Sequence, residues 1–183
     1  VRETTEQTAL AVNERLNKEY GHHPWEPRYD PLSELISTIL SQNTSDVNSH
    51  RAFRRLREGF LSWESVLDAP VEDIVAAIQT GGLAQVKAPR IKAVLAQIRK
   101  ERGDLTLDFL RNLETAEARA WLRSLPGVGA KTAAIVLLFS LGKPALPVDT
   151  HVHRVTRRLG LLCESDSAEK AHEVLESLLP PEA

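Results

Sequence analysis

Twelve consecutive residues, 130–141, are apolar on nearly every side of the helix that they would form. Their sequence, AKTAAIVLLFSL, has a single charged side chain, Lys131, in its first turn. A helix of this kind has no face suited to water, so it is stable only when other elements surround it. The sequence therefore predicts a fold built around a central buried helix, with Lys131 near its N-terminal end.

The rest of the chain is also predicted to be helical. Apolar residues recur at spacings of three and four, and no segment keeps the strict alternation typical of a half-buried strand. Short breaks that contain Gly, Pro or Asp separate the segments. The predicted helices cover residues 4–19, 31–41, 46–58, 71–79, 86–102, 115–124, 130–141, 150–159 and 167–179. The fold class is therefore all-α.

A chain of 183 residues is long enough for one domain or for two small lobes that share a cleft. No change in composition marks a boundary between lobes. We expect residues 25–125 to form one helical lobe. Residues 1–24 and 126–183 then form a second lobe, which packs both chain ends together and carries Lys131 at the junction.

Charge is distributed unevenly along the chain. The formal net charge of −2 by itself argues against a nucleic-acid partner, but residues 31–159 carry 18 Lys and Arg against 13 Asp and Glu. Two predicted helices concentrate these cations, namely Arg51, Arg54, Arg55 and Arg57 in the first and Lys87, Arg90, Lys92, Arg99, Lys100 and Arg102 in the second. Two interpretations remain open, a solvated face on each helix or a surface that binds DNA or RNA.

Cysteine content and hydropathy indicate the environment of the protein. The single cysteine, Cys163, lies in the apolar stretch LGLLC and is predicted to be a buried core residue, as free cysteines usually are. One cysteine cannot form an intrachain disulfide, which favours a reducing interior. No apolar run approaches the length of a membrane span, so we expect a soluble intracellular protein that does not contact a membrane.

The segment LPGVGAKTA predicts a tight turn between two helices. The first helix should end near Ser124, with Gly127 at a positive φ and Gly129 allowing the backbone to turn without a Cβ in the way. The first N–H groups of the second helix would then be unpaired at the positive end of its dipole. This is a site for a phosphate-sized anion, to which Thr132 adds a hydroxyl group. An ordinary glycine-capped corner explains the same residues equally well.

Lys131 is predicted to be a nucleophile. An apolar neighbourhood and the positive end of a helix dipole both disfavour the ammonium form of a lysine. A lysine kept neutral can attack an electrophile. The alternative is a lysine that extends from the helix end into water.

Asp149 is predicted to return to the neighbourhood of Lys131. The helix 130–141 is about 18 Å long, and the six residues 143–148, which include two prolines, reach roughly 20 Å. The connection can therefore run back along the helix. Asp149 would cap the following helix, THVHRVTRRLG, and capping alone explains an aspartate at this position. A capping carboxylate can still face a cleft, so both roles are compatible.

The combination of LPGVGAKTA and VDTHVHRVTRRLGL resembles the helix-hairpin-helix DNA glycosylases, specifically the endonuclease III branch, from about residue 10 to the end of the chain. The resemblance implies a base-excision repair enzyme with both DNA glycosylase and abasic-site lyase activity. It implies that Lys131 attacks the sugar C1′, that Asp149 assists departure of the base, and that β-elimination through a lysine Schiff base cleaves the strand. The expected substrates are oxidised pyrimidines in damaged double-stranded DNA. A glycosylase of mismatched bases and a non-catalytic DNA-binding module remain alternatives.

The resemblance also implies the residues that contact DNA. The segment LSQNTSDVNS supplies Gln42, Asn43, Thr44 and Asp46, and the segment GGLAQVKA supplies Leu83, Ala84, Gln85 and Lys87. Asn43 stands where relatives often have a wedge glutamine, Leu83 is expected to wedge into the base stack, and Gln85 and Lys87 are expected to contact a strand. Gly127, Gly129, Thr132 and His151 are expected near phosphates. A simple helix cap is the alternative explanation for the polar loop around Thr44.

The family usually carries a [4Fe–4S] cluster held by four cysteines. Cys163 alone cannot hold one, so we expect no cofactor from these 183 residues and a cluster only if the native chain continues past Ala183 with four cysteines. No metal site is expected, because His151 and His153 are two residues apart and do not face each other on a helix. The resemblance further implies a monomer in the cytoplasm of a bacterium or archaeon, associated with the nucleoid.

Overall fold

The computed structural model describes residues 4–21 and 24–179. Within these ranges it has ten α-helices and two 3₁₀ helices. In chain order they are α1 (Thr5–Tyr20), α2 (Pro31–Ser41), α3 (Asp46–Gly59), α4 (Trp63–Asp68), α5 (Val71–Ile78), η1 (Gln79–Gly81), α6 (Ala84–Arg102), η2 (Asp108–Asn112), α7 (Thr115–Ser124), α8 (Ala130–Leu141), α9 (Thr150–Arg158) and α10 (Ala168–Ser177).

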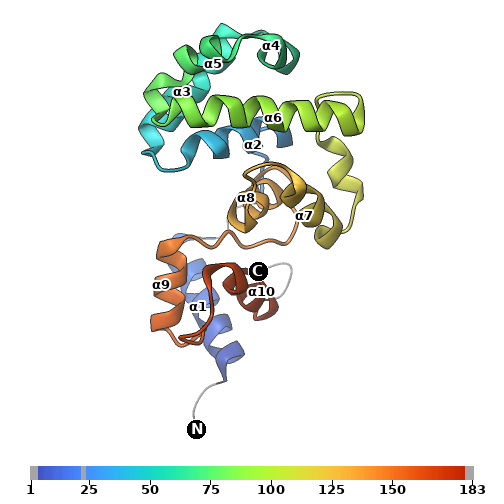
Figure 1. Ribbon diagram of the computed structural model, residues 1–183. Coiled ribbons are helices and arrows are strands. Elements are labelled where there is room, and N and C mark those ends of the chain that lie inside the picture. The colour runs from blue at the N-terminus through green and yellow to red at the C-terminus, as the bar shows by residue number, and fades with distance from the viewer. Residues whose placement is uncertain (1–3, 22–23, 180–183) are drawn as a thin grey trace.

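The helices form an upper and a lower group joined by α8 (Figure 1). In the upper group α6 crosses the molecule, with α2 behind it and α3, α4 and α5 above. Helix α8 packs against α2, α7 and α10. Helices α1, α9 and α10 lie below α8, and the extended segment between α8 and α9 runs across the boundary. Segments from both ends of the chain, α1 and α10, therefore meet in the lower group.

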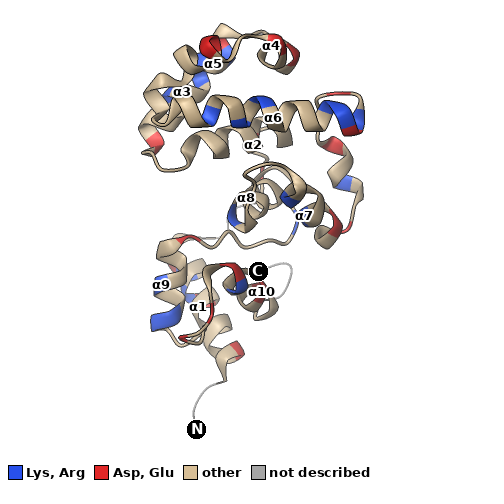
Figure 2. Cartoon of the chain, in the orientation of Figure 1, with Lys and Arg blue, Asp and Glu red and all other residues tan. Residues whose placement is uncertain are grey.

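Both α3 and α6 carry Lys and Arg residues (Figure 2), and their side chains have different environments. On α3, Arg51 and Arg54 are exposed while Phe53 and Leu56 are buried, as in an ordinary amphipathic helix. On α6, Lys92 instead donates a hydrogen bond to the carbonyl of Ala69. A solvated face therefore describes α3, whereas the first half of α6 uses cations as internal ties.

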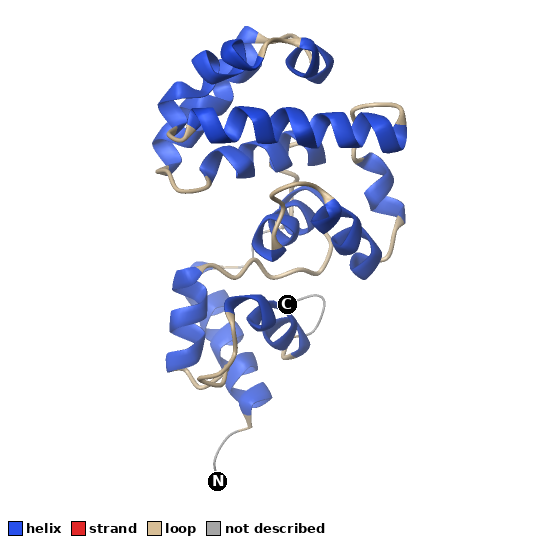
Figure 3. Ribbon diagram, viewed as in Figure 1, coloured by secondary structure: helices blue, strands red, loops and turns tan. Residues whose placement is uncertain are grey.

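Every regular element in the described residues is a helix, and they contain no strand (Figure 3), which confirms the all-α prediction. None of the helices in these ranges combines the length and the apolar character needed to cross a bilayer. Helix α4 was missing from the predicted set, because its six residues are too few to show a period. Helix α6 begins at Ala84, two residues before its predicted start, because Leu83 acts as its N-cap in a left-handed conformation.

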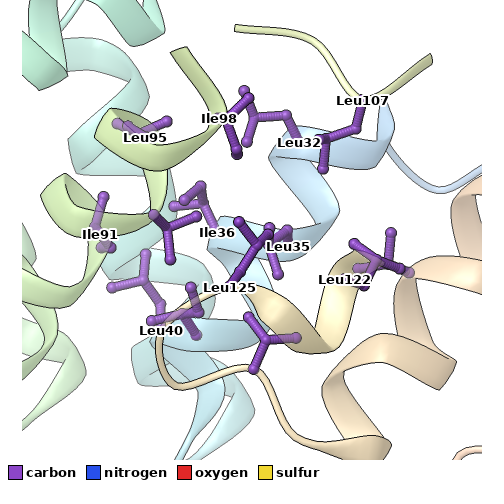
Figure 4. Close-up of a cluster of buried hydrophobic side chains, with 14 of the residues drawn as sticks. Leu32, Leu35, Ile36, Leu40, Ile91, Leu95, Ile98, Leu107, Leu122 and Leu125 are labelled. Atoms are coloured by element: carbon purple, nitrogen blue, oxygen red, sulfur yellow. The ribbon is translucent and has the colours of Figure 1, made fainter. Parts of the chain in front are cut away.

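The larger hydrophobic core lies around α2 (Figure 4). Asp30 caps this helix by accepting a hydrogen bond from the Ser33 N–H at 2.9 Å, and Pro31 follows at its first position. Side chains from α2 and α6 interdigitate with residues of the α7 end, and Figure 4 labels Leu32, Leu35, Ile36, Leu40, Ile91, Leu95, Ile98, Leu107, Leu122 and Leu125. Helix α2 is therefore as central as α8.

Helix α8 is buried on most but not all of its surface. Ala133, Ala134 and Leu137 have no exposed surface, as expected for a central helix. Phe139, by contrast, is 40% exposed. Lys131, Ile135 and Phe139 follow one another at steps of four residues, so they share one side of the helix and spread over about 80° of its circumference. One face of α8 is therefore open, although its sequence is apolar almost throughout.

The buried hydrophobic side chains form two clusters. The larger core includes residues of α8 and extends to Ala145, and the smaller core brings Ala9 together with Val148, Ala171 and Leu175. Most of the surface of α8 is apolar and packs on α2 and α7, so this helix belongs to the larger core. The division into lobes between residues 125 and 126 stays a prediction.

Cys163 is exposed, so its predicted burial is wrong. The stretch LGLLC buries Leu161 and Leu162 instead, and both belong to the smaller core. Apolar neighbours in sequence do not fix which side of an irregular segment faces inward.

Candidate active site

The turn between α7 and α8 has the predicted geometry at Gly127. Gly127 has a φ of +74°, which an L side chain rarely adopts. A Cβ at this position would also lie 2.5 Å from Nε of Arg90, so the guanidinium of α6 occupies that space. Gly129 differs from the expectation, because its φ is −92° and a Cβ there would meet nothing within 4 Å. The N-terminus of α8 is therefore open to the outside at Gly129.

Lys131 was predicted to be enclosed by apolar side chains, and this prediction is wrong. Its side chain is 51% exposed, and its Nζ lies 3.8 Å from Oδ2 of Asp149. The lysine stands on the open face of α8 together with Ile135 and Phe139. Its surroundings are thus an accessible pocket and a carboxylate.

Asp149 is brought back to Lys131 and caps α9, as predicted. Its Oδ1 accepts hydrogen bonds from the N–H groups of His151 at 2.9 Å and Val152 at 2.8 Å. Because Oδ1 is engaged by the helix, Oδ2 is left to face the lysine. One carboxylate therefore serves both the cap and the cleft.

Hydrogen bonding and nearby positive charge keep Asp149 ionised. The hydrogen bond from the N–H of Val152 is the largest cause and lowers the pKa of Asp149; burial opposes it, and Lys131 and His151 then lower the pKa further. A carboxylate with a lowered pKa carries its negative charge throughout the neutral range. The site therefore holds a fixed negative charge beside the lysine.

A pocket of about 250 Å³ extends from Lys131 between α2, α3 and α8. Its walls are Ile135 and Phe139 of α8, Ser37, Thr38 and Ser41 of α2, Asp46, Ser49 and His50 of α3, and Arg28. The volume is below that of pockets for drug-sized ligands and suits a smaller group. Of this wall, only Asp46 and Lys131 had been identified from the sequence as site residues. The spacing of Lys131, Ile135 and Phe139 along one helix face is the signal that could have revealed it.

Arg28 is fixed at the pocket by a buried carboxylate. Its Nε donates to Oε2 of Glu34 at 2.9 Å, and its Nη2 is paired with Oε1 of the same residue. The side chain of Glu34 has no exposed surface, whereas that of Arg28 is 49% exposed. The hydroxyl group of Thr38 donates a longer hydrogen bond to Oε1 at 3.4 Å. Arg28 therefore presents its outer edge to the pocket from a rigid base.

Asn43 and Leu83, the two residues aligned with DNA-wedge positions, share an unusual backbone conformation. Both have a φ of 53°, and they are the only non-glycine residues with a positive φ in the described parts of the chain. Both side chains are exposed, Leu83 by 53%. A left-handed conformation costs a residue such as Leu83 about 1–2 kcal/mol, so the surrounding structure must impose it there, whereas asparagine adopts it more readily. Strain of this kind is typical of functional sites.

The other residues expected to contact DNA differ in how exposed they are. Gln85 is exposed on the first turn of α6 and Thr44 is partly exposed, whereas Ala84 is buried. His151 is exposed at the start of α9, with its Nδ1 3.0 Å from Nη2 of Arg154. Thr132 is only 6% exposed, and its hydroxyl group accepts a hydrogen bond from Gln42. The prediction that Thr132 adds a hydroxyl to an anion site is thus not supported by its position.

Lys87 is also directed into the protein. The residue is 2% exposed, and its Nζ donates to the carbonyls of Leu40 at 2.7 Å and Gly81 at 2.9 Å. Burial lowers the pKa of Lys87. The expected contact with a DNA strand is not available in this conformation, because the ammonium group is used inside the protein.

A second hollow, of about 410 Å³, lies beside α9 and contains neither member of the lysine–aspartate pair. It is lined by His153, Arg154, Arg157, Arg158, Leu162 and Glu164. The preponderance of cations favours an anionic partner at this surface. We place the chemistry at the smaller pocket, because it is lined by Lys131, which is paired with Asp149.

The donor set does not fit an iron–sulfur cluster. Such a cluster needs four thiolates and the sequence has one cysteine, Cys163. Residues 4–21 and 24–179 also hold no group of three or more His, Cys, Asp or Glu side chains that could bind a metal ion. No step of the chemistry below is therefore assigned to a metal.

The chain is similar in sequence to known DNA repair proteins. The model of the family described as "HhH-GPD superfamily base excision DNA repair protein" matches residues 36–181. The chain is 39% identical over 151 residues to endonuclease III of Thermotoga maritima, which covers 82% of this chain. The chain spans 66% of the length of this Thermotoga maritima protein. It spans 52% of the length of another relative, to which it is 40% identical.

Solved structures of endonuclease III share the fold. A non-covalent complex of endonuclease III with DNA is similar with a TM-score of 0.80 at 29% identity, over 99% of this chain and 80% of that one. A trapped covalent intermediate of endonuclease III with DNA is similar with a TM-score of 0.78 at 29% identity, over 99% and 81% of the two chains. Both likenesses extend over nearly all of the present chain.

Proposed function

The chain belongs to the HhH-GPD superfamily of base excision DNA repair proteins, and on this premise we propose that it is a bifunctional DNA glycosylase and abasic-site lyase. The observation that carries the proposal is the pairing of Lys131 and Asp149, 3.8 Å apart at the mouth of a small pocket. A covalent intermediate has been trapped for a protein of the same fold, endonuclease III, which supports a covalent route.

The first chemical step breaks the bond between the sugar C1′ and the base. The base leaves with the electron pair, and positive charge develops on the sugar. The carboxylate of Asp149 stabilises that charge electrostatically, because its ionised form is already held in place by the cap of α9. The pre-oriented Oδ2 needs no rearrangement during the reaction.

The second step forms the covalent bond. Lys131 attacks as the free amine, so its proton must first pass to Asp149 or to water. The bond between Nζ and C1′ then replaces the bond to the base, and opening of the sugar ring gives a Schiff base. This iminium acidifies the C2′ proton, and its loss expels the 3′ phosphate by β-elimination. Water finally hydrolyses the Schiff base and regenerates the amine.

The pocket supports a single-ring, oxidised base as the substrate. The damaged nucleotide must leave the duplex stack before its C1′ can come close to Lys131. Ile135 and Phe139 offer an apolar wall for a ring, and Ser37, Ser41 and Arg28 offer polar groups for its oxygen substituents. The volume of about 250 Å³ favours a pyrimidine over a larger base.

The DNA-binding surface is proposed to combine the wedge loops and the hairpin. Asn43 and Leu83 are exposed and would contact the duplex, and the open N-terminus of α8 at Gly129 suits a phosphate. Phosphate contacts of this kind make binding fall with increasing salt.

Borohydride reduction tests the proposal directly. The protein is incubated with duplexes that carry a single thymine glycol, abasic site, 8-oxoguanine or G·T mismatch. We expect a reduced covalent adduct with the first two duplexes and little with the others. Tight binding without an adduct would instead support a non-catalytic module, and excision limited to the mismatch would support a mismatch glycosylase.

Asp149→Asn is expected to slow base excision by roughly 10²–10³-fold. Asparagine is also a good N-cap, so α9 should still form and the loss reports the charge. Because the pKa of Asp149 is below its ordinary value of 3.8, the wild-type rate should show no acid limb from this group above about pH 4. The stabilising effect of its charge is present above the unfolded-state pKa and is lost only as the pH falls through the lower folded-state pKa.

Single-turnover excision rates between about pH 5 and pH 8 check this prediction. The ratio of wild-type to variant rates should stay constant across the range. Asp30→Asn, at the cap of α2, is the matched control and should leave the rate unchanged. A ratio that collapses toward one at pH 5 would show that Asp149 titrates there, against the prediction.

A further inference from the structure

Gln42 links three helices through its side chain. Nη1 of Arg90 on α6 donates to its Oε1 at 2.9 Å, and its Nε2 donates to the hydroxyl group of Thr132 on α8 at 3.4 Å. Gln42 itself is the C-cap of α2 and immediately precedes Asn43, one of the two strained wedge residues. Both ends of its amide are therefore fixed directly beside the wedge.

Arg90 is held in place by the hairpin. Its side chain lies against Gly127, where a Cβ would approach Nε at 2.5 Å and Cδ at 2.6 Å. The guanidinium thus fills the space that glycine leaves at the turn before α8. Arg90 consequently contacts both the hairpin and the loop that carries Asn43.

Lys87 makes the corresponding connection one turn earlier on α6. Its buried ammonium group bonds to the carbonyl of Leu40, near the end of α2, and to the carbonyl of Gly81, just before Leu83. These carbonyls precede the two wedge residues, Asn43 and Leu83, in their respective segments. Burying a cation is unfavourable unless it is well bonded, so the position is a demanding one for lysine.

We propose that Arg90 and Lys87 are positioning residues for base extrusion. They fix the two wedge loops to each other and to the hairpin, and thereby hold Asn43 and Leu83 in the left-handed conformations that point them at a duplex. The inference rests on the proposed function, because it assigns these ties to the step in which a nucleotide leaves the stack. Neither side chain touches the reacting atoms.

The proposal predicts a defect that depends on the duplex. In double-stranded DNA the wedge residues must fill the gap left by the extruded nucleotide, whereas a single-stranded abasic oligonucleotide leaves no such gap. Loss of the ties should therefore slow the reaction on duplex DNA alone. A general loss of folding, or a displacement of Lys131, would slow the reaction on both.

Arg90→Met is the main test variant, because it keeps an unbranched side chain and removes the donors to Gln42. Borohydride trapping is followed under single-turnover conditions on the same abasic sequence as a duplex and as a single strand. We expect the duplex rate to fall roughly 10–100-fold, in the range that misplacement by about 1 Å produces. The single-strand rate should stay within about twofold of wild type.

A double-mutant cycle tests whether Arg90 acts through Gln42. Gln42→Met should reproduce the duplex defect, and the double variant should be no slower than the worse single variant, because both remove the same hydrogen bond. Fluorescence of 2-aminopurine placed opposite the abasic site should show slower extrusion in each variant. Lys18→Met, an exposed cation of α1, controls for the change in charge.

Three results would overturn the inference while leaving the proposed function intact. These are an unchanged duplex rate in Arg90→Met, an equal loss on single strands, and additive losses in the double variant. A weaker salt dependence of binding in Arg90→Met would identify the residue as a direct phosphate contact instead. If the wild type forms no adduct on any abasic substrate, the proposed function itself fails.

Discussion

Replacing Lys131 with glutamine is expected to abolish the covalent adduct that borohydride traps on an abasic-site duplex. Glutamine cannot form a Schiff base, so no reducible intermediate exists. Strand cleavage by β-elimination should fall by a factor on the order of 10⁴ or more, as when an enzyme loses its nucleophile. Denaturing gel electrophoresis of the reduced reaction measures both the adduct and the cleaved strand.

The structure predicts that this variant still folds and still binds DNA. The side chain of Lys131 is 51% exposed and packs in no hydrophobic cluster, so its replacement creates no cavity. The melting temperature and the affinity for an abasic duplex should therefore stay close to the wild-type values. Lys18→Gln, a lysine on α1 outside the pocket, should trap as well as the wild type.

An adduct that persists in Lys131→Gln would identify another amine as the nucleophile and remove the basis of the lyase assignment. Unfolding of the variant would also contradict the structure, because replacing the half-exposed side chain of Lys131 should not destabilise the fold. The clean outcome is a folded, DNA-binding protein without covalent chemistry.

Much of the site's framework could be predicted from local sequence. The positive φ of Gly127 and the capping role of Asp149 follow from turn and cap chemistry, which act over a few residues. The return of Asp149 to Lys131 followed from comparing the length of a helix with the reach of an extended segment. The resemblance to endonuclease III, based on the same residues, is confirmed by the relatives and the shared fold.

The environments of single side chains could not be predicted in this way. Lys131 was expected to be enclosed because its sequence neighbours are apolar, but the neighbours that matter are one and two turns away, at Ile135 and Phe139. Lys87 was expected at the surface, yet its carbonyl partners lie 47 and 6 residues away in sequence. Such partners are set by how α2 and α6 pack, which no short motif records.

The ion pair between half-exposed Arg28 and buried Glu34 leads to the largest expected effect on stability. Arg28→Met removes the cation that pairs with Glu34, whose carboxylate has no exposed surface. A buried charge left without its partner costs about 3–5 kcal/mol. For a chain of this size each kcal/mol lowers the melting temperature by roughly 2–4 °C. We therefore expect a fall of at least about 6 °C, measured by thermal unfolding followed by circular dichroism.

The reverse change should be milder, and this asymmetry is the sharper test. In Glu34→Gln the partly exposed Arg28 can turn toward water, so no charge is trapped. Replacing both residues, as Arg28→Met with Glu34→Leu, should recover most of the lost stability, since a buried pair exchanged for apolar side chains is often close to neutral. Equal losses in both single variants, or a double variant as unstable as Arg28→Met, would show that the pair stabilises by packing alone. The double variant could also regain stability but not excision. This result would show that the outer edge of Arg28 contacts the base in the pocket, because the folded double variant lacks only that contact.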